Sequence, residues 1–262
     1  MNVVIFGYGR MGKLVHKVLD ERGIRIWGIA EPDGLKIPAG VTSPGGIKHV
    51  GEGDILHADT AICFTSPPES AYGITKAILG KGIDAIVGTT KWYLNPDKSV
   101  NQDMIAELDE LAKQHDCRFV YAPNFSIGMN VFWQNLKQLA PVLAEHGYDV
   151  AVVEEHHSKK ADAPSGTANT IGSILLEAYA GKKTALKTDF STPIQPHEIG
   201  ISVVRAGDIP GTHRVIFESA VDKFVLEHVV HDREIFAKGA VDTAYWAKEQ
   251  KPGAYCITDR LK

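Results

Sequence analysis

The segment from Glu154 to Ala168 concentrates residues that can move protons. It reads Glu-Glu-His-His-Ser-Lys-Lys-Ala-Asp-Ala-Pro-Ser-Gly-Thr-Ala. Neighbours on a strand face opposite sides, so His156 and His157 cannot both point into an apolar core, and at least one should reach a cleft or solvent. Histidine has an unperturbed pKa near neutrality and can donate a proton at pH 7. Lys160 adds a cation that suits a carboxylate or a second proton transfer.

The end of this segment has the pattern of an anion site at the start of a helix. Gly166 would let an anion approach unpaired backbone N–H groups, and the hydroxyl of Thr167 adds a donor. Each residue also has an ordinary structural interpretation: a solvated strand end, a solvated turn, or a helix cap at Ser165. Their concentration in one segment favours catalysis on a small anion. No metal site is predicted, because His156, His157 and a distant third ligand show no recognisable ligand spacing.

A second motif lies near the start of the chain and fits the pattern G-x-G-x-x-G between a predicted strand and a predicted helix. There a tight turn lets a pyrophosphate approach a helix N-terminus. Glu31 and Asp33 follow at the end of the next predicted strand, where an acidic side chain is wanted for ribose hydroxyls. The alternative is a turn that uses glycine only for packing. The residues of this glycine loop are Gly7, Tyr8, Gly9, Arg10, Met11 and Gly12.

The choice of dinucleotide rests on charge. Glu31 and Asp33 would repel a 2′-phosphate, and Pro32 stands between them where a cation would be needed. Arg10 in the glycine loop could attract such a phosphate. We therefore expect NADH to be favoured and NADPH to be tolerated.

Three later loops also follow predicted strands, and loops at the carboxyl ends of parallel strands line the ligand crevice of an open α/β sheet. One is the loop at 65–68. The small and hydroxylated residues of these loops suit a nicotinamide and its ribose, although ordinary turns use the same residues. The predicted cofactor contacts in the other two loops are Gly88, Thr89, Thr90, Ala122, Pro123, Asn124 and Phe125.

Short β-rich runs alternate with helical patterns in the first half of the chain. This alternation predicts an α/β fold: a Rossmann-like, doubly wound parallel sheet with helices on both faces. The predicted strands are 3–6, 24–30, 61–64, 83–87 and 118–121, and the predicted helices are 13–21, 68–79 and 102–114.

The pattern changes after Pro123, which predicts a second, α+β domain with a mostly antiparallel open sheet. Short turns separate the last three β-rich runs and favour antiparallel pairing between them. We expect the closing helix, 233–248, to return to the first domain. The domains are then 1–125 plus 232–262, and 126–231. Within the second domain, helices are predicted at 128–146 and 167–179 and strands at 149–155, 199–205, 213–219 and 224–230.

Composition excludes several classes of protein. Against 28 Lys and Arg the chain has 32 Asp and Glu, a net charge of −4, which argues against nucleic-acid binding through bulk positive charge. No apolar run approaches the roughly 20 residues that span a bilayer, and the start lacks the basic region of a signal peptide. Cys63, Cys117 and Cys256 lie far apart, which fits a reducing compartment. We expect a soluble cytoplasmic protein.

The motif Glu-x-His-His-x-x-Lys-x-Asp-x-Pro-Ser-Gly-Thr-Ala resembles the central motif of the dihydrodipicolinate reductase family, also called 4-hydroxy-tetrahydrodipicolinate reductase. Residues 7–12, 88–90, 122–128, 205–213 and 233–240 are similar to other segments of that family, so the resemblance covers nearly the whole chain. It implies that His156 is the general acid/base and Lys160 a second proton donor. It also implies that His157 contacts the substrate and that Gly166 and Thr167 hold one of its carboxylates.

The reaction implied by this resemblance is the reduction of 4-hydroxy-tetrahydrodipicolinate, a cyclic dicarboxylate, to tetrahydrodipicolinate by NADH or NADPH in lysine and diaminopimelate biosynthesis. Similar proteins are homotetramers that assemble through the sheet of the substrate domain. Two alternatives remain. One is another two-domain dehydrogenase of an amino dicarboxylate, with ammonia-dependent turnover. The other is a dinucleotide-sensing protein without catalysis.

The chain departs from the family pattern at three places. Its glycine loop is one residue shorter than the family form. Pro32 stands where NADPH-preferring members often carry a basic residue. Lys91 and Trp92 follow Gly88-Thr89-Thr90 where glycine is expected. These departures bear on cofactor preference and efficiency more than on the reaction.

Overall fold

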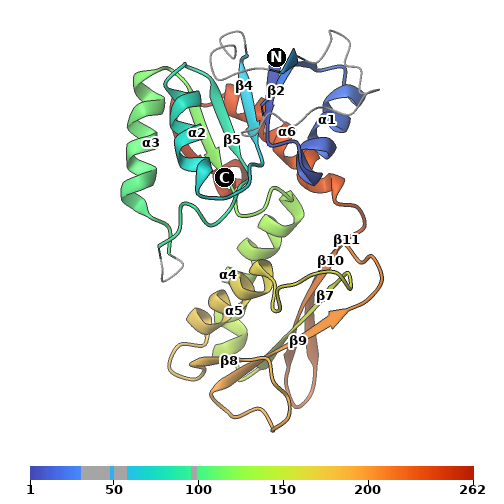
Figure 1. Ribbon diagram of the computed structural model, residues 1–262. Coiled ribbons are helices and arrows are strands. Elements are labelled where there is room, and N and C mark those ends of the chain that lie inside the picture. The colour runs from blue at the N-terminus through green and yellow to red at the C-terminus, as the bar shows by residue number, and fades with distance from the viewer. Residues whose placement is uncertain (31–47, 50–57, 96–98) are drawn as a thin grey trace. The chain divides into compact units, whose positions relative to one another are not determined.

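The computed structural model describes residues 1–30, 48–49, 58–95 and 99–262 (Figure 1). The chain divides into two compact units. The first consists of Met1–Ser126 together with Glu234–Lys262, and the second of Ile127–Arg233. No helix in these described ranges is both long and apolar enough to span a membrane.

The described residues of the first unit form a seven-stranded sheet in the order β12-β6-β5-β4-β1-β2-β3. Every pair of neighbouring strands is parallel. The strands at its centre are buried on both faces, which explains their continuous apolar sequences. The parallel Rossmann-like sheet is therefore confirmed. Its strands are β1 Asn2–Phe6, β2 Arg25–Ala30, β3 Lys48–His49, β4 Thr60–Cys63, β5 Asp84–Val87, β6 Arg118–Tyr121 and β12 Gly253–Cys256.

Helix α1 contacts α6, and α2 contacts α3, so the sheet carries two helix pairs (Figure 1). Lys17 of α1 forms an ion pair with Glu234 of α6, and Arg22 lies 2.5 Å from Asp242. The closing helix thus lies in the first unit. The helices of this unit are α1 Arg10–Glu21, α2 Ser70–Leu79, α3 Gln102–Gln114 and α6 Glu234–Lys248, and a 3₁₀ helix at Ile257–Leu261 follows β12.

Two expectations for this unit need correction. Helix α2 begins at Ser70 and not at Pro68, because the carbonyls of Pro67 and Pro68 accept hydrogen bonds from Ser70 and Ala71 in a turn before the helix. Strand β12 was not predicted. It adds to the edge of the sheet beside β6. Because β12 is only partly buried, its sequence lacks the apolar run that marks the fully buried strands β4 and β5.

The second unit has a five-stranded mixed sheet in the order β11-β10-β7-β9-β8. β10 is antiparallel to both β11 and β7, whereas β9 is parallel to both β7 and β8. The mostly antiparallel second sheet is confirmed. The elements are α4 Ile127–Glu145, β7 Asp149–His156, α5 Gly166–Ala178, β8 Ala185–Lys187, β9 Glu198–Arg205, β10 Gly211–Glu218 and β11 Lys223–Val230.

The expected pairing of the runs 199–205 and 213–219 is wrong, because β7 lies between β9 and β10. The connection between β9 and β10 crosses the end of β7, and backbone hydrogen bonds hold it there. Ala206 donates to the carbonyl of His156 at 2.9 Å, and Ser158 donates to the carbonyl of Gly207 at 3.1 Å. The sequence predicts a turn between β9 and β10, but the length of this turn does not reveal that it passes over β7.

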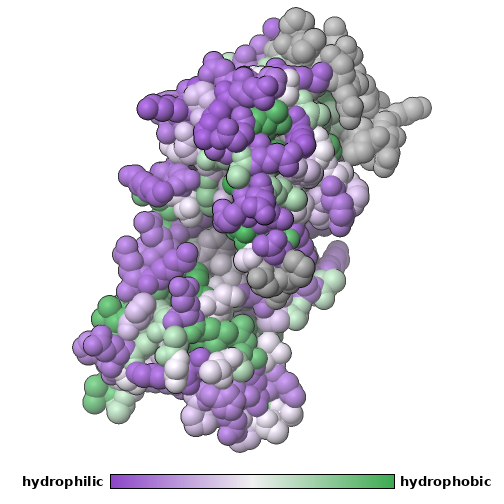
Figure 2. All heavy atoms as spheres, turned by 90° about the vertical axis from the view of Figure 1, so that its left-hand side faces the viewer, coloured by the Kyte–Doolittle hydropathy of each residue, from purple (hydrophilic) through white to green (hydrophobic). Residues whose placement is uncertain are grey.

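Helices α4 and α5 cover one face of this sheet and form a core with it. Val150 and Val152 of β7 and Val215 and Phe217 of β10 alternate with more exposed neighbours, as expected for strands with one buried face. Figure 2 shows that hydrophobic residues also lie at the surface, among hydrophilic ones. Because Val150 and Val152 face this core, every second residue that follows them on β7 must lie on the same buried face.

Candidate active site

The buried row of β7 ends in two titratable side chains. Val150, Val152, Glu154 and His156 occupy alternate positions on the strand, and all four are buried. Glu154 is fully buried and His156 is 9% exposed. His157 lies just beyond the strand and is half-buried. Of the two histidines, His156 is therefore the one that lies among buried groups.

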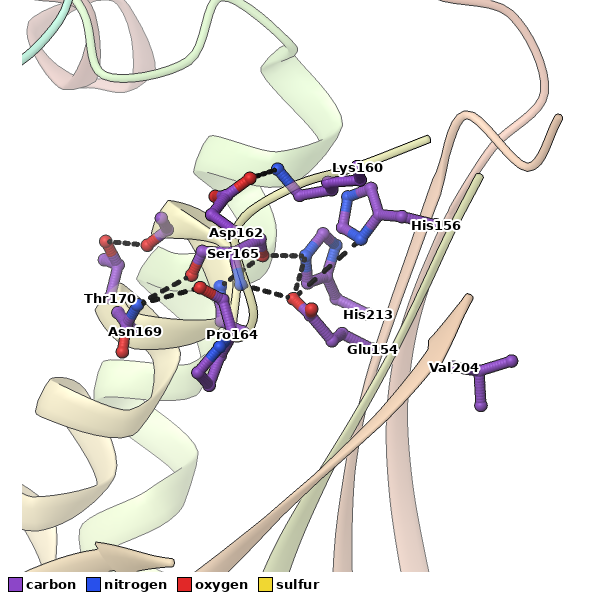
Figure 3. A network of polar contacts seen from close by, with 12 residues as sticks. Glu154, His156, Lys160, Asp162, Pro164, Ser165, Asn169, Thr170, Val204 and His213 are labelled. Carbon is purple, nitrogen blue, oxygen red and sulfur yellow. Dashed lines mark hydrogen bonds and ion pairs between the residues drawn. The ribbon is translucent and has the colours of Figure 1, made fainter. Parts of the chain in front are cut away.

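The register of the sheet brings distant residues to the same place. His213 on β10 is paired with Glu154, and Arg205 on β9 is paired with His156. The rings of His156 and His213 meet edge to face with their centroids 5.2 Å apart. Figure 3 shows the two imidazoles and Glu154 pointing toward one another and toward the start of α5, whereas Val204 points away.

Ser165 joins this cluster to α5. Its hydroxyl caps the helix by accepting a hydrogen bond from the N–H of Ala168 at 3.1 Å, and its own N–H donates to Oε2 of Glu154 at 2.9 Å. Gly166 and Thr167 follow as the first two helical residues. A Cβ at Gly166 would meet no atom within 4 Å, and the first turn carries no acidic residue. The helix N-terminus is therefore open, and its dipole favours an anion.

The carboxylate of Glu154 is ionised although it is buried. An NH₂ group of Arg205 donates to Oε1 at 2.6 Å. Burial alone would raise the pKa of Glu154, but the hydrogen bonds from Ser165 and Arg205 outweigh burial and hold this pKa below its ordinary value. Glu154 is thus a fixed negative charge at the centre of the site.

Both buried imidazoles are neutral at pH 7. Burial lowers the pKa of His156 to about 4, and the positive charges of Lys160 and Arg205 act in the same direction, against the carboxylate of Glu154. Burial likewise lowers the pKa of His213 to about 4. The near-neutral pKa expected of a histidine therefore does not hold for His156 in the ligand-free protein, where desolvation disfavours the imidazolium.

Lys160 lies in the loop after β7, with its Nζ 2.6 Å from Oδ1 of Asp162. Arg205 donates to the backbone carbonyl of Asp162 at 2.7 Å, so the loop is tied to β9. Glu154 and Asp162 carry two negative charges, and Lys160 and Arg205 carry two positive ones. With the charges balanced, the open end of α5 leaves a net preference for an anionic ligand.

Glu154, His156 and His213 each offer one ligand atom, and these atoms lie within 4.8 Å of one another, a grouping that could hold a metal ion. The charges oppose this use. Arg205 already pairs with Glu154, and the positive charge of Lys160 acts on both histidines. The absence of a metal stays a prediction.

In the first unit, the glycine loop fits a pyrophosphate. Gly7 has φ +85°, and a Cβ there would lie 2.4 Å from the carbonyl oxygen of Phe64; a Cβ at Gly12 would lie 2.1 Å from the carbonyl oxygen of Gly7. Gly9 caps α1 without a side-chain hydrogen bond, and a Cβ there would meet nothing within 4 Å. Open space therefore faces a helix N-terminus whose first turn has no acidic residue.

The remaining residues of this loop differ in their surroundings. The hydroxyl of Tyr8 lies 2.6 Å from Nδ1 of the buried His16, whose Nε2 lies 2.9 Å from Asp20. Arg10 is exposed and Met11 is half-buried. Glu31 and Asp33, which were predicted to bind the ribose, lie outside the described residues, as does Pro32.

The loops after β4, β5 and β6 meet, as their positions at the carboxyl ends of neighbouring strands predict. The hydroxyls of Thr65 and Thr89 lie 3.2 Å apart. A Cβ at Gly88 would lie 2.1 Å from the ring of Phe64, and the ring of Phe125 is 6.1 Å from that of Phe64. Among the other predicted contacts, Ala122 is buried, Thr90 and Asn124 are half-buried, and Pro123 is exposed.

Lys91 adopts a backbone conformation that favours glycine. Its φ of +77° lies in the left-handed region, and Trp92 follows with its Nε1 donating to the carbonyl of Thr89 at 2.8 Å. The chain thus has a backbone conformation typical of glycine at the place where glycine was expected, although the residue itself differs.

Residues 1–125 match the family described as "Dihydrodipicolinate reductase, N-terminus", and residues 128–261 match "Dihydrodipicolinate reductase, C-terminus". The chain belongs to the dihydrodipicolinate reductase family. A dihydrodipicolinate reductase is an oxidoreductase, and with the Rossmann-like sheet this membership implies a nicotinamide dinucleotide as cofactor.

Two relatives show that the similarity is global. The 4-hydroxy-tetrahydrodipicolinate reductase of Methanosarcina barkeri is 34% identical over 272 residues, covering 100% of this chain and 99% of the relative. The protein of the same name from Methanospirillum hungatei is 34% identical over 266 residues, covering 100% of this chain and 98% of the relative.

Solved structures share the fold. The dipicolinate-bound dihydrodipicolinate reductase from Paenisporosarcina sp. TG-14 has a TM-score of 0.77 at 20% identity and covers 100% of this chain and 99% of its own. An amine dehydrogenase from Mycobacterium smegmatis has a TM-score of 0.60 at 16% identity, with 98% and 95% covered. At these identities the likeness extends to the fold alone.

Sequence reasoning missed three members of the site in this dihydrodipicolinate reductase chain. Glu154 had a local signal, because it lies two residues before His156 on a strand and must share its face. Arg205 and His213 lie in the family-like segment 205–213, but nothing in that segment placed them in the site, since only the sheet register brings them beside β7.

Proposed function

We propose that the chain catalyses the NAD(P)H-dependent reduction of 4-hydroxy-tetrahydrodipicolinate to tetrahydrodipicolinate in lysine and diaminopimelate biosynthesis. One observation carries this proposal: the buried imidazole of His156 and the open N-terminus of α5 lie on the same side of the second unit, joined through Glu154 and Ser165. A proton donor beside an anion site is what the reduction of a cyclic dicarboxylate requires.

In this proposal the backbone N–H groups at Gly166 and Thr167 bind one substrate carboxylate, with the hydroxyl of Thr167 and the side chain of His157 as further contacts. The reduced nicotinamide, when bound, supplies the hydride. The hydroxyl leaves as water when Lys160 protonates it and the neighbouring ring carbon loses a proton. After the hydride has added to the ring, His156 donates a proton back to the ring, so that the sum is one hydride and one proton gained and one water lost. The cation of Lys160, paired with Asp162 in the free protein, turns to the substrate.

The substrate itself would prepare His156 for this role. In the free protein, burial and the nearby cations keep His156 neutral. A bound dicarboxylate brings two negative charges to the same place, and an anion close to an imidazole raises its pKa. Binding would therefore place a proton on His156 when a reacting partner is present.

The proposed dinucleotide site lies in the first unit. Gly7, Gly9 and Gly12 would hold the pyrophosphate at the start of α1, and the loops at 88–90 and 122–125 would receive the nicotinamide and its ribose. Arg10 is exposed and would attract the 2′-phosphate of NADPH. We propose NADH as the favoured cofactor, with Glu31 and Asp33 on the ribose hydroxyls.

We also propose that the second unit binds the substrate and forms a homotetramer through its sheet. α4 and α5 cover one face of this sheet. Val204 of β9 and Val225 and Val229 of β11 have the opposite parity to the core-facing residues, and each is between 41% and 44% exposed. Sedimentation equilibrium on the chain and on a Val225→Asp variant tests this assembly.

The decisive experiment compares the oxidation of NADH and NADPH, with the substrate generated in place from pyruvate and aspartate semialdehyde by the preceding synthase. Substrate-dependent oxidation supports the reductase, and the ratio of the two rates gives the cofactor preference. Ammonia-dependent turnover of an amino dicarboxylate would favour the alternative dehydrogenase. Dinucleotide binding without turnover of either substrate would favour a sensing protein.

A further inference from the structure

His213 and Glu154 form a buried connection between three elements of the second unit. Glu154 comes from β7, His213 from β10 and Ser165 from the start of α5. Nε2 of His213 lies 3.3 Å from Oγ of Ser165 and 4.0 Å from Oε2 of Glu154. Figure 3 shows these contacts as a continuous set between the strands and the helix.

The surroundings of His213 determine where its proton lies. Nε2 faces an ionised carboxylate and a hydroxyl oxygen, whereas Nδ1 is buried without a hydrogen-bond partner among the described residues. The neutral ring therefore holds its proton on Nε2 and donates it to Ser165. This fixes the Ser165 hydroxyl, which already accepts from Ala168 and holds the first turn of α5.

The same ring contacts the proton donor. His156 has no hydrogen-bond partner for its buried Nδ1 among the described residues, and that atom lies 3.9 Å from Oε2 of Glu154. The edge-to-face contact with His213 and the carboxylate of Glu154 are thus what orients the imidazole of His156. One side of His213 touches the donor and the other touches the anion-binding turn.

We propose that His213 and Glu154 are positioning residues that hold the proton donor His156 at a fixed place relative to the substrate-carboxylate site at the start of α5. This inference rests on the proposed reductase function. Neither residue need touch the substrate. Their role is to keep two groups from different elements in reacting geometry, where a misplacement of 1 Å costs roughly 100-fold in rate.

Two substitutions at His213 separate positioning from packing. Leucine fills much of the same space without a donor, whereas glutamine restores an N–H that can reach Ser165. We expect His213→Leu to lower kcat by roughly 100-fold and His213→Gln to recover about tenfold of that loss. The affinity for NADH, measured by fluorescence, should stay unchanged in both variants, because the glycine loop lies in the other unit.

A control and an independent variant complete the test. His197→Leu removes an exposed histidine from the same unit and should leave kcat unchanged. Glu154→Gln keeps an acceptor for the N–H of Ser165 but removes the negative charge that raises the pKa of His156. It should lower kcat and move the alkaline limb of the pH–rate profile, where the proton donor loses its proton, to lower pH. The titratable and charged groups around His156 that govern this limb are Glu154, His157, Lys160, Arg205 and His213.

The outcomes are distinct. Equal kcat values for His213→Leu and His213→Gln would show that the ring acts only by filling space and would overturn the proposal. If His213→Leu fails to fold, the test rests on His213→Gln and Glu154→Gln. A kcat within twofold of the wild-type value in both variants would overturn the positioning proposal. A wild-type protein without reductase activity would instead overturn the proposed function itself, so the wild type is measured first.

Discussion

Gly211 lies directly against His156. A Cβ at Gly211, the first residue of β10, would lie 3.1 Å from Nε2 of His156. The absence of a side chain therefore leaves space beside the nitrogen that faces away from Glu154. β10 thus supplies this space at Gly211 and, two residues later, the imidazole of His213.

Gly211→Ala should lower kcat by about tenfold, because the new methyl group displaces His156 and covers Nε2. Gly207→Ala is the matched control. Gly211 and Gly207 both have a positive φ, of +155° and +47° respectively. A Cβ at Gly207, however, would meet no atom within 4 Å. Both variants carry backbone strain, and only the first should lose turnover at saturating substrate. Equal losses would show that strain alone accounts for the effect.

His156→Ala should reduce turnover by roughly two to four orders of magnitude, since it removes the proposed general acid. The affinity for NADH, measured by calorimetry, should not change, because no predicted dinucleotide contact lies on β7. Steady-state kinetics with the enzymatically generated substrate measures the effect. Kinetics close to those of the wild type would remove His156 from its assigned role.

Stability should fall in mild acid because two buried histidines resist protonation. The folded pKa of His156 and of His213 is about 4, below the ordinary value of 6.5. Their contribution is complete above pH 6.5 and is lost as the pH falls toward 4, where the unfolded chain binds more protons. The free energy of unfolding should drop by up to about 1.4 kcal/mol per pH unit for each imidazole.

Urea unfolding at a series of pH values checks this slope. The matched comparison is His213→Gln, which removes one of the two histidines and should flatten the dependence between pH 6.5 and 4. Parallel curves for the wild type and His213→Gln would contradict the assignment of a depressed pKa to His213.

Thr167→Ala should raise the KM for the dicarboxylate by about tenfold while kcat changes little, because a hydrogen bond to a charged group contributes roughly 1.5 kcal/mol or more. Thr167→Ser retains the hydroxyl and should behave like the wild type. An unchanged KM in Thr167→Ala would exclude this side chain from the carboxylate site.

Tyr8→Phe should weaken dinucleotide binding by about two- to tenfold. Asp20 accepts from Nε2 of His16, so Nδ1 of His16 is the acceptor for the Tyr8 hydroxyl. The substitution removes this hydrogen bond between the glycine loop and α1, and it leaves the buried Nδ1 unsatisfied. Fluorescence titration with NADH measures the change. Tyr72→Phe, which removes a hydroxyl bonded to Glu107 between α2 and α3, is the control and should bind NADH normally.

The local signals in this chain were strong wherever neighbouring residues share one element. Helix α3 begins and ends at the predicted residues 102 and 114, where an apolar stripe follows a cap: Asn101 accepts from the N–H of Met104 at 3.0 Å. The burial of His156 on the same face as Glu154 agrees with strand geometry, since the two residues lie two apart on β7. The strands β3 and β8 gave no comparable pattern, since two or three residues cannot establish a period, and β12 is only partly buried and lacks an apolar run.

The sequence by itself determined the two kinds of fold and the family, and it pointed to the segment in which we propose the proton donor and the anion-binding turn, because these signals depend on spacing within a few residues. Only the tertiary structure decided that β7 separates β9 from β10, that Arg205 and His213 meet Glu154, and that His156 is neutral in the free protein. Register and desolvation cause these results. Both arise from residues far apart in the chain, whose encounter no local pattern records.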